Sequence, residues 1–254
     1  MESISAVIIA QDEARNISRC LQSLEGVADE VVVVDSGSTD QTEALCTAAG
    51  ARFVSHAWAG YAEQKNYANS IAQSAWILSI DADEALSDEL RDSLLELKQR
   101  GFDCDTVYAF ARLNSYCERW VHHGPWYPDI KTRLFPKEGT AWSGVVHEEL
   151  LFNHPVKTVT LNGKLLHYSY ASFDDLKERQ EHYAALAAHK AYNLGKRSNV
   201  YTRRLKAGWT FLRNYLFKLG FLDGRDGFTI CRMSAYYTFK KYSILHDLQH
   251  QDHA

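Results

Sequence analysis

The stretch Val31-Val32-Val33-Val34-Asp35-Ser36-Gly37-Ser38-Thr39-Asp40 decides the fold class of this chain. Four consecutive β-branched apolar residues end at a carboxylate, and a strand that is apolar on both faces is typical of the centre of a parallel sheet. The polar turn that follows contains Ser38 and leads to Gln41, a capping-box pattern that starts a helix running to Gly50. The stretch therefore predicts a buried strand, a tight turn and a helix in succession.

The same alternation of strand and helix patterns extends over residues 1–100. Strand-like runs and helical spacings follow one another at residues 4–10, 17–24, 31–34, 38–50, 52–55, 62–74, 76–80 and 87–97. Such alternation predicts an α/β fold with a doubly wound, mostly parallel sheet. Residues 102–170 are expected to form short strands joined by aromatic loops. We therefore expect one domain at residues 1–170 and a C-terminal helical extension at residues 171–254.

The composition of the chain excludes several classes of protein. With 254 residues, of which 46% are hydrophobic and 24% charged, the chain can bury a core and is neither disordered nor a coiled-coil rod. No apolar run reaches the roughly 18 residues of a membrane-spanning helix. The acidic start shows no secretory signal, and five scattered cysteines without a C-x-x-C motif are typical of reduced thiols. We therefore expect a cytoplasmic protein.

Charge is divided unevenly along the chain. Residues 195–245 hold eleven Lys/Arg, two Asp and eleven aromatic residues, a net charge of +9. Because the whole chain carries −4, the remaining residues carry −13, the difference between the two values. Within this segment, basic residues alternate with apolar ones, as in helices that lie on a membrane surface: Arg203, Arg204, Lys206, Arg213 and Lys218.

This basic segment has several interpretations. We expect it to contact a membrane surface, at the inner face of the cytoplasmic membrane, or an anionic acceptor, since anionic headgroups attract Lys and Arg. A helix that covers the sheet and a dimer contact are the alternatives. Nucleic-acid binding is not expected, because the rest of the chain is strongly acidic and no recognition motif is present.

Acidic residues follow the predicted strands. In doubly wound sheets ligands bind beyond the carboxyl ends of the strands, so Asp12, Asp35, Asp81 and Asp83 are expected at one edge. Asp81 and Asp83, two residues apart after an apolar strand, suit Mg²⁺ or Mn²⁺, hard ions that prefer oxygen ligands. The alternative is a turn acid followed by carboxylates that stabilise a helix N-terminus.

Asp35 and Lys65 are candidates for contacts with a nucleotide. A carboxylate at the end of the second strand can accept from a base N–H or a ribose hydroxyl, and the Ser-Gly-Ser turn after it lets the backbone approach a ligand. Ordinary turn and cap chemistry is the alternative. Lys65, on a polar helical segment, would place a cation near a diphosphate; the alternative is a solvated helix face.

Two later segments carry further candidates. In His147-Glu148-Glu149 a carboxylate close to aromatic residues suits a general base, and a surface acidic pair is the alternative. Trp126-Tyr127-Pro128-Asp129 offers flat apolar faces and an acid that suit a carbohydrate ring, and ordinary core packing is equally consistent. A G-x-G-x-x-G motif, a Walker A motif and a G-x-S-x-G elbow are absent from the sequence, which disfavours dehydrogenases, P-loop enzymes and serine hydrolases.

Taken together, the segments of the first 90 residues resemble those of family 2 glycosyltransferases. Residues 10–17 resemble the strand-end N-E-x-x-N-I segment of that family, with Gln11-Asp12 where the family more often has Asn-Glu. Residues 31–40 match its VVVDSGSTD signature, and residues 60–66 and 81–84 follow in the expected order. A narrower resemblance, to the small bacterial β-glycosyltransferases that build the lipopolysaccharide inner core, rests on residues 126–129, 133–135, 146–148, 222–227 and 241–242.

The resemblance implies a GT-A fold over residues 1–170, a nucleotide-sugar donor, a divalent Mg²⁺ or Mn²⁺ ion and inversion at the anomeric carbon. UDP-glucose as donor is implied by the narrower branch. The implied roles are nucleotide binding by Asp12, Asp35, Lys65 and Asp81, metal binding by Asp83, and general base catalysis by Glu148, with Glu149 as its rival. Acceptor binding is expected at Trp126, Tyr127 and Asp129.

Three functions are therefore to be considered for this sequence. The favoured one is an inverting, metal-dependent glycosyltransferase that acts on a lipid-linked oligosaccharide. A sugar nucleotidyltransferase would require a glycine-rich basic loop after the first strand, where Gln11-Asp12-Glu13 is acidic instead. A non-catalytic protein that binds anionic lipid would use the basic segment and would leave the acidic strand ends unexplained.

Overall fold

The computed structural model describes residues 2–144 and 148–251, and the chain folds into two compact units. The first unit is Met1–Arg112 with Asp129–Tyr168, and the second is Leu113–Pro128 with Ser169–Ala254. Residues 113–128, expected from the sequence to belong to the domain at 1–170, thus group with the C-terminal helices. Among the described residues, no helix combines the length and the apolar character needed to cross a bilayer.

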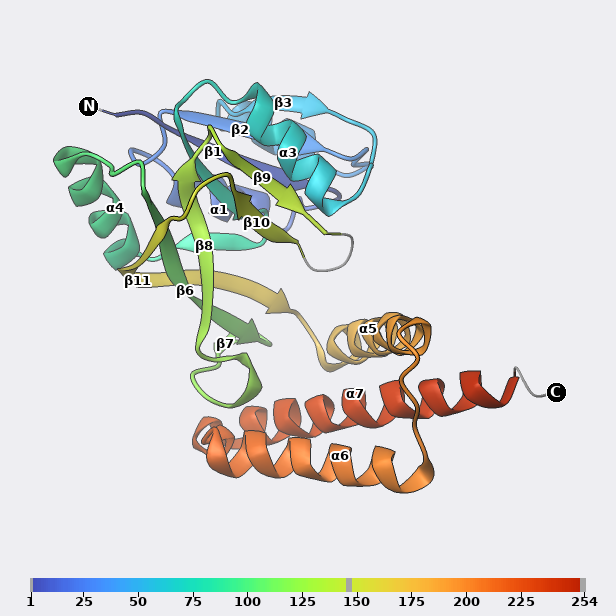
Figure 1. Cartoon of the computed structure of the whole chain (residues 1–254). Helices are drawn as coiled ribbons and strands as arrows, with labels where there is room; N and C mark the ends of the chain where they lie inside the picture. Colours follow the sequence, from blue (N-terminus) through green and yellow to red (C-terminus); the bar gives the residue numbers. More distant parts are fainter. Residues whose placement is uncertain (1, 145–147, 252–254) are drawn as a thin grey trace. The chain divides into compact units, whose positions relative to one another are not determined.

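The first unit begins with the predicted alternation of strands and helices (Figure 1). Its parallel strands lie in the order β3-β2-β1-β4, and every neighbouring pair among them is parallel. These elements are β1 (Ile4–Ala10), α1 (Ile17–Ser23), β2 (Glu30–Asp35), α2 (Thr42–Ala48), β3 (Arg52–Ser55), α3 (Tyr61–Ile71) and β4 (Trp76–Asp81). The predicted α/β fold with a C-terminal helical extension is therefore confirmed.

Beyond β4 the sheet contains antiparallel pairs, so the sheet as a whole is mixed. Beyond β4 the order continues β8-β6-β11-β5, with antiparallel pairing of β8 to both β4 and β6 and of β5 to β11. These strands are β5 (Glu84–Leu86), β6 (Thr106–Tyr116), β7 (Arg119–Trp120, paired with β6), β8 (Asp129–Pro136) and β11 (Lys157–Tyr170). The parallel part is confined to β1, β2, β3 and β4, whose connections each contain a helix, whereas β4 leads into β5 without one.

The two faces of the parallel strands pack against different elements. On β1, Ala6 and Ile8 belong to a core cluster with Leu21 of α1 and with Leu90 of α4 (Asp88–Arg100). Val7, which points to the opposite face, belongs to a second cluster with α3 and with the hairpin of β9 (Thr140–Ser143) and β10 (Glu149–Phe152). Residues on a strand alternate between the faces of the sheet, so one strand contributes to both cores.

The second unit is largely helical. It contains η1 (Gly124–Trp126), α5 (Phe173–Asn193), α6 (Val200–Leu212), the π-helical turn η2 (Arg213–Phe217), η3 (Gly220–Asp223) and α7 (Gly224–Gln251). The long helix α7 lies between α5 and α6 and packs against both (Figure 1). Its core joins Ile230 and Met233 of α7 to Leu176 of α5, with Tyr116 and Val121 from residues 113–128.

Candidate active site

The carboxyl ends of β2 and β4 meet on either side of β1. In the parallel register Asp35 is paired with Ala10, and Asp81 is paired with Ile9, so the two acids end their strands at nearly the same level. This is the edge at which parallel α/β sheets bind their ligands. The candidate site in the first unit is built around this edge.

Asp35 organises the turn that follows β2. Its Oδ2 accepts hydrogen bonds from the backbone N–H groups of Gly37 and Ser38, both at 2.8 Å, and the Ser38 hydroxyl donates to Oδ1. Gly37 has φ = 98°, a left-handed conformation that glycine adopts without strain. Asp35 is only 3% exposed, so its carboxylate first of all holds this turn in shape.

The turn after β2 is tied to the loop after β1. Asp12 donates its N–H to the Ser38 hydroxyl at 2.8 Å, and its Oδ1 accepts from the Thr39 N–H at 2.7 Å. Asp40 Oδ2 accepts from the Ala14 N–H at 3.0 Å, and hydrogen bonds, above all from the Thr42 hydroxyl, lower the pKa of Asp40. The two loops therefore form one bonded rim, which includes the predicted nucleotide ligands Asp12 and Asp35.

Lys65 of α3 brings distant carboxylates together. Its ammonium Nζ lies 3.3 Å from Asp81 Oδ1 and 3.7 Å from Glu148 Oε2, and 4.9 Å from the centre of the Trp142 ring. The side chain of Lys65 is only 7% exposed, so the alternative of a solvated helix face is wrong. The predicted base Glu148 and the predicted nucleotide-binding residues Lys65 and Asp81 therefore lie close together.

Asp81 is held by two cations. Arg133 of β8 donates to Asp81 Oδ2 at 2.6 Å, on the other side of the carboxylate from Lys65. Burial opposes ionisation of Asp81, but the charges of Arg133 and Lys65 outweigh it and hold the pKa of Asp81 well below its usual value. Asp81 therefore stays ionised.

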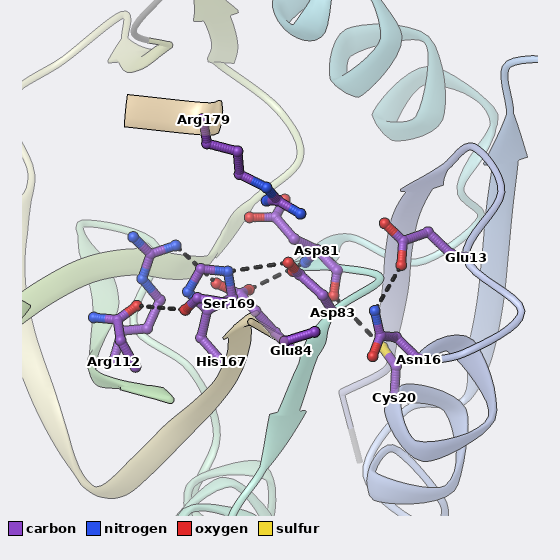
Figure 2. Close-up of polar contacts among 12 residues, drawn as sticks. Glu13, Asn16, Cys20, Asp81, Asp83, Glu84, Arg112, His167, Ser169 and Arg179 are labelled. Atoms are coloured by element: carbon purple, nitrogen blue, oxygen red, sulfur yellow. Dashed lines mark hydrogen bonds and ion pairs between the residues drawn. The ribbon is translucent and has the colours of Figure 1, made fainter. Parts of the chain in front are cut away.

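A buried charge network continues behind Asp81. Glu84, which is almost fully buried, accepts from Arg112 at 3.2 Å (Figure 2) and from Arg133 at 2.5 Å. Arg112 also donates to Asp129 at 2.8 Å. Burial tends to lower the pKa of Arg133, but Asp81 and Glu84 raise it overall. Glu84, Arg112 and Arg133 were not identified as site residues from the sequence. The available signal was an arginine inside the apolar strand Arg133-Leu134-Phe135, because a buried arginine requires an acidic partner.

Asp83 has a different partner. Its Oδ2 lies 3.1 Å from Nε2 of His167 (Figure 2). Its carbonyl accepts from the Tyr168 N–H at 2.9 Å. The pairing of β5 with β11 creates this contact, since it places His167 opposite Glu84, the residue after Asp83. His167 was also not identified from the sequence, because its approach depends on strand pairing across more than eighty residues.

The donor set around Asp83 fits a divalent ion. Asp83 contacts no Lys or Arg within the described residues, whereas Asp81 is already neutralised by two cations. A carboxylate oxygen and an imidazole nitrogen at this spacing can both ligate Mg²⁺ or Mn²⁺, and such ions keep further positions for phosphate oxygens. In the described part of the chain, three ligating groups cluster closely only at the exposed residues Asp103, Cys104 and Asp105, which carry no second sign of a site.

Glu148 and Glu149 are in different environments. Glu148 is partly buried beside Lys65, whereas Glu149 begins β10, is exposed and pairs with Ser143 across the hairpin. Of the neighbouring candidate residues, His147 lies outside the described part of the chain, as do Val145 and Val146. The geometry therefore places Glu148, rather than Glu149, next to Lys65 and Asp81.

The predicted acceptor residues are divided between the two units. Asp129 belongs to the first unit, where Arg112 and Lys131 pair with it and, against the effect of burial, lower its pKa. Trp126 and Tyr127 belong to the second unit. Trp126 stacks on Tyr170 at 5.1 Å and packs against the core of that unit, so the core-packing interpretation applies to at least one face of its ring.

Comparison with known proteins identifies the family of this chain. The family model for glycosyl transferase family 2 matches residues 5–154. An uncharacterized glycosyltransferase of Rickettsia bellii is 31% identical over 98% of this chain and 88% of its own length. The lipopolysaccharide core biosynthesis glycosyltransferase LpsC of Rhizobium meliloti is 32% identical over 93% of this chain and 89% of its own length.

Among solved structures the overlap is much shorter. Glucosyl-3-phosphoglycerate synthase from Mycobacterium tuberculosis, solved with Mn²⁺, UDP and phosphoglyceric acid, matches 33% of this chain and 34% of its own chain, at 32% identity and a TM-score of 0.30. This chain thus spans about a third of that structure. The family model covers more than half of the sequence, and the relatives are similar along nearly all of it: the chain belongs to glycosyl transferase family 2.

Proposed function

We propose that this glycosyltransferase moves a sugar, with inversion, from a UDP-sugar donor to a hydroxyl of a lipid-linked oligosaccharide such as the lipopolysaccharide core. The observation that carries the proposal is the position of Lys65, between Asp81 at the end of β4 and Glu148 beside the hairpin. The name of the Rhizobium meliloti relative supports the class of acceptor. We assign glucose as the sugar and the cytoplasmic face of the membrane as the place of reaction.

The rim formed by the loops after β1 and β2 would bind the nucleotide. Asp35 holds the turn at Gly37 and Ser38, and Asp12 ties that turn to the first loop, so the ligand meets a preformed surface. Lys65 and Asp81 lie at the neighbouring strand end. A preformed site lowers the cost of ordering side chains when the donor binds.

A divalent ion, Mg²⁺ or Mn²⁺, would be held by Asp83 together with His167. When bound, such an ion neutralises the negative charge that develops on a leaving diphosphate. Asp81 contributes less to holding the ion, because Arg133 and Lys65 already compensate its charge. Arg133 and Glu84 instead fix the position of the segment that carries both acids.

Glu148 would act as the general base. Its carboxylate takes the proton of the acceptor hydroxyl while that oxygen attacks the anomeric carbon, and the bond from that carbon to the nucleoside diphosphate breaks. A single displacement inverts the configuration and needs no nucleophile from the enzyme. Lys65 holds the Glu148 carboxylate at the site, while Trp126, Tyr127 and Asp129 remain our predicted contacts for the acceptor.

Substituting the two neighbouring glutamates tests the proposal. We expect Glu148→Gln to lower kcat by about 10²–10⁴-fold, the usual contribution of a general base, with the donor Kd changed less than about threefold. The matched control, Glu149→Gln, keeps both values near wild type. UDP release gives kcat, calorimetry with UDP-glucose gives the Kd, and NMR of the product gives its anomeric configuration. If Glu149→Gln is the variant that loses turnover, or the product retains the donor configuration, the proposed mechanism is wrong.

A further inference from the structure

The outer face of α6 carries a stripe of exposed apolar side chains. Tyr201, Leu205, Trp209 and Leu212 follow one another at intervals of four, four and three residues, so they lie along one face of the helix. Tyr201 is 78% exposed and Leu205 72%, and Trp209 is also more than half exposed. The stripe continues into the π-helical turn η2, where Phe217 is 70% exposed. Single exposed apolar residues are common on protein surfaces, but a continuous row of them marks an interaction surface.

The inner face of α6 already has its partner within the second unit. The guanidinium of Arg203 lies over the Phe239 ring of α7, and Lys206 donates to the Tyr242 hydroxyl at 2.8 Å. These two residues were expected from the sequence to face a membrane or an anionic acceptor, but both contact α7. The apolar stripe on the outer face is therefore not needed for packing against α7.

Basic residues flank the apolar stripe. Residues 200–222 contain five Lys/Arg and no Asp or Glu. Of these, Arg204, Arg213 and Lys218 are exposed, and no ion pair joins them to a carboxylate within the described residues. A surface with apolar side chains in the middle and basic ones at its border is complementary to an anionic bilayer, which offers acyl chains below negative headgroups.

The same charges argue against a second copy of this chain as the partner. A symmetric dimer brings the same surface of both copies together, so the basic border would face itself. Like charges placed against each other across an interface oppose association. The charge pattern therefore favours a lipid surface over self-association.

We propose that the membrane-facing surface of this protein consists of Tyr201, Leu205, Trp209, Leu212 and Phe217, which enter the interfacial layer of an anionic bilayer. Arg204, Arg213 and Lys218 then lie at headgroup level. The inference rests on the proposed function only in that a lipid-linked acceptor requires the enzyme to reach a membrane. The contact with the membrane is then made by exposed apolar side chains of α6 and η2. These side chains are not covered by α7.

Vesicle binding tests the surface without reference to catalysis. The wild-type chain is sedimented with vesicles of phosphatidylcholine alone or with about 30% phosphatidylglycerol, a content that gives a negative surface potential. We expect binding to the anionic vesicles only. Leu205→Ser combined with Trp209→Ser should weaken this binding at least about tenfold. Arg204→Gln and Lys218→Gln should each weaken it about fivefold and reduce its dependence on salt.

The matched control changes exposed leucines on another helix of the same unit. Leu186→Ser combined with Leu194→Ser removes two such side chains at α5 and should leave vesicle binding unchanged. The proposal is overturned if wild type does not bind anionic vesicles, if the Leu205/Trp209 variant binds as well as wild type, or if the control loses binding equally. Dissociation of a wild-type dimer by the Leu205/Trp209 variant, seen by ultracentrifugation, would also overturn it, because the stripe would then be a contact between copies.

Transfer to a soluble, deacylated acceptor separates this inference from the proposed function. If the Leu205/Trp209 variant loses vesicle binding and transfers to the soluble acceptor at the wild-type rate, both are supported. If the wild-type chain binds vesicles through the stripe but transfers no sugar, the surface stands and the proposed function fails.

Discussion

The turns after β2 and β4 differ in what their carboxylates contact. Both turns are acidic, and both follow strands that flank β1. After β2, Asp35 and Asp40 accept hydrogen bonds from groups of their own turn and of the loop after β1. After β4, Asp81 and Asp83 contact ionisable side chains that come from α3, β8 and β11.

The carboxylates of the first turn therefore fix a backbone shape, whereas those of the second turn bring charged side chains together. The turn after β2 is a preformed backbone surface, because its acids are used to fix N–H groups. The turn after β4 collects charges that can respond to a ligand, because its acids are paired with side chains from distant parts of the chain. We infer that the first turn determines how the nucleotide fits and that the second performs the electrostatic work of the reaction.

The largest effect on stability should follow loss of the cation that joins Asp81 to Glu84. We expect Arg133→Met to lower the free energy of unfolding by about 3 kcal/mol, because it leaves the buried Glu84 and the partly buried Asp81 short of a partner. The value lies at the low end of the range for breaking a buried pair, since Lys65 and Arg112 remain in place. Urea unfolding followed by circular dichroism measures the change.

A surface arginine provides the control for this substitution. Arg100 pairs with Glu96 on the exposed side of α4, so Arg100→Met should cost less than about 1 kcal/mol. Equal losses for the two variants would show that the charge network behind β4 has no special structural role.

A smaller effect is expected in the turn after β2. Asp35→Asn replaces a charged acceptor of backbone hydrogen bonds with a neutral one, and we expect a loss of about 1–2 kcal/mol in the free energy of unfolding. Donor affinity should fall in parallel, because the turn that we propose to contact the nucleotide loses its shape. If stability is unchanged while calorimetry shows that donor affinity is lost, the Asp35 carboxylate contacts the ligand directly. Its main role would then not be to fix the shape of the turn, and the proposed contrast between the two turns would be wrong.

The last of these predictions concerns acid stability. The pKa of Asp81 is lowered in the folded chain, so its contribution to stability is complete above the unfolded value of about 3.9 and is lost as the pH falls toward the folded value. Each such group changes the free energy of unfolding by at most about 1.4 kcal/mol per pH unit. Because Arg133 holds down this pKa, the Arg133→Met variant should lose less stability than wild type between pH 4 and pH 2 in urea titrations. A steeper loss in the variant would contradict this assignment.

Much of the fold was predictable because its signals are local. The run of valines at 31–34 and the apolar strand at 76–80 each precede a polar turn, and the rule for parallel sheets then places Asp35 and Asp81 at one edge. The registers of β2 and β4 against β1 agree with that expectation. The helices at the C-terminus were also visible from their spacing.

The rest of the site was hidden because it depends on pairing between distant strands. Arg133 reaches Asp81 through β8, which is antiparallel to β4, and His167 reaches Asp83 through β11. The sequence contains no local pattern that gives the register of these strands. For the same reason, the grouping of residues 113–128 with the C-terminal helices could not be read from the order of elements.

Binding of Mn²⁺ in the presence of UDP, followed by calorimetry, shows whether the turn after β4 holds the metal. If Asp83 and His167 hold the ion, Asp83→Asn should weaken Mn²⁺ binding at least about tenfold, as expected when a carboxylate ligand is lost. The matched control is Asp88→Asn, since Asp88 is a fully exposed acid in the first turn of α4 and should leave the affinity unchanged. If Asp83→Asn binds Mn²⁺ with UDP as tightly as wild type, the turn after β4 does not hold the metal, and the division of roles between the two turns is incorrect.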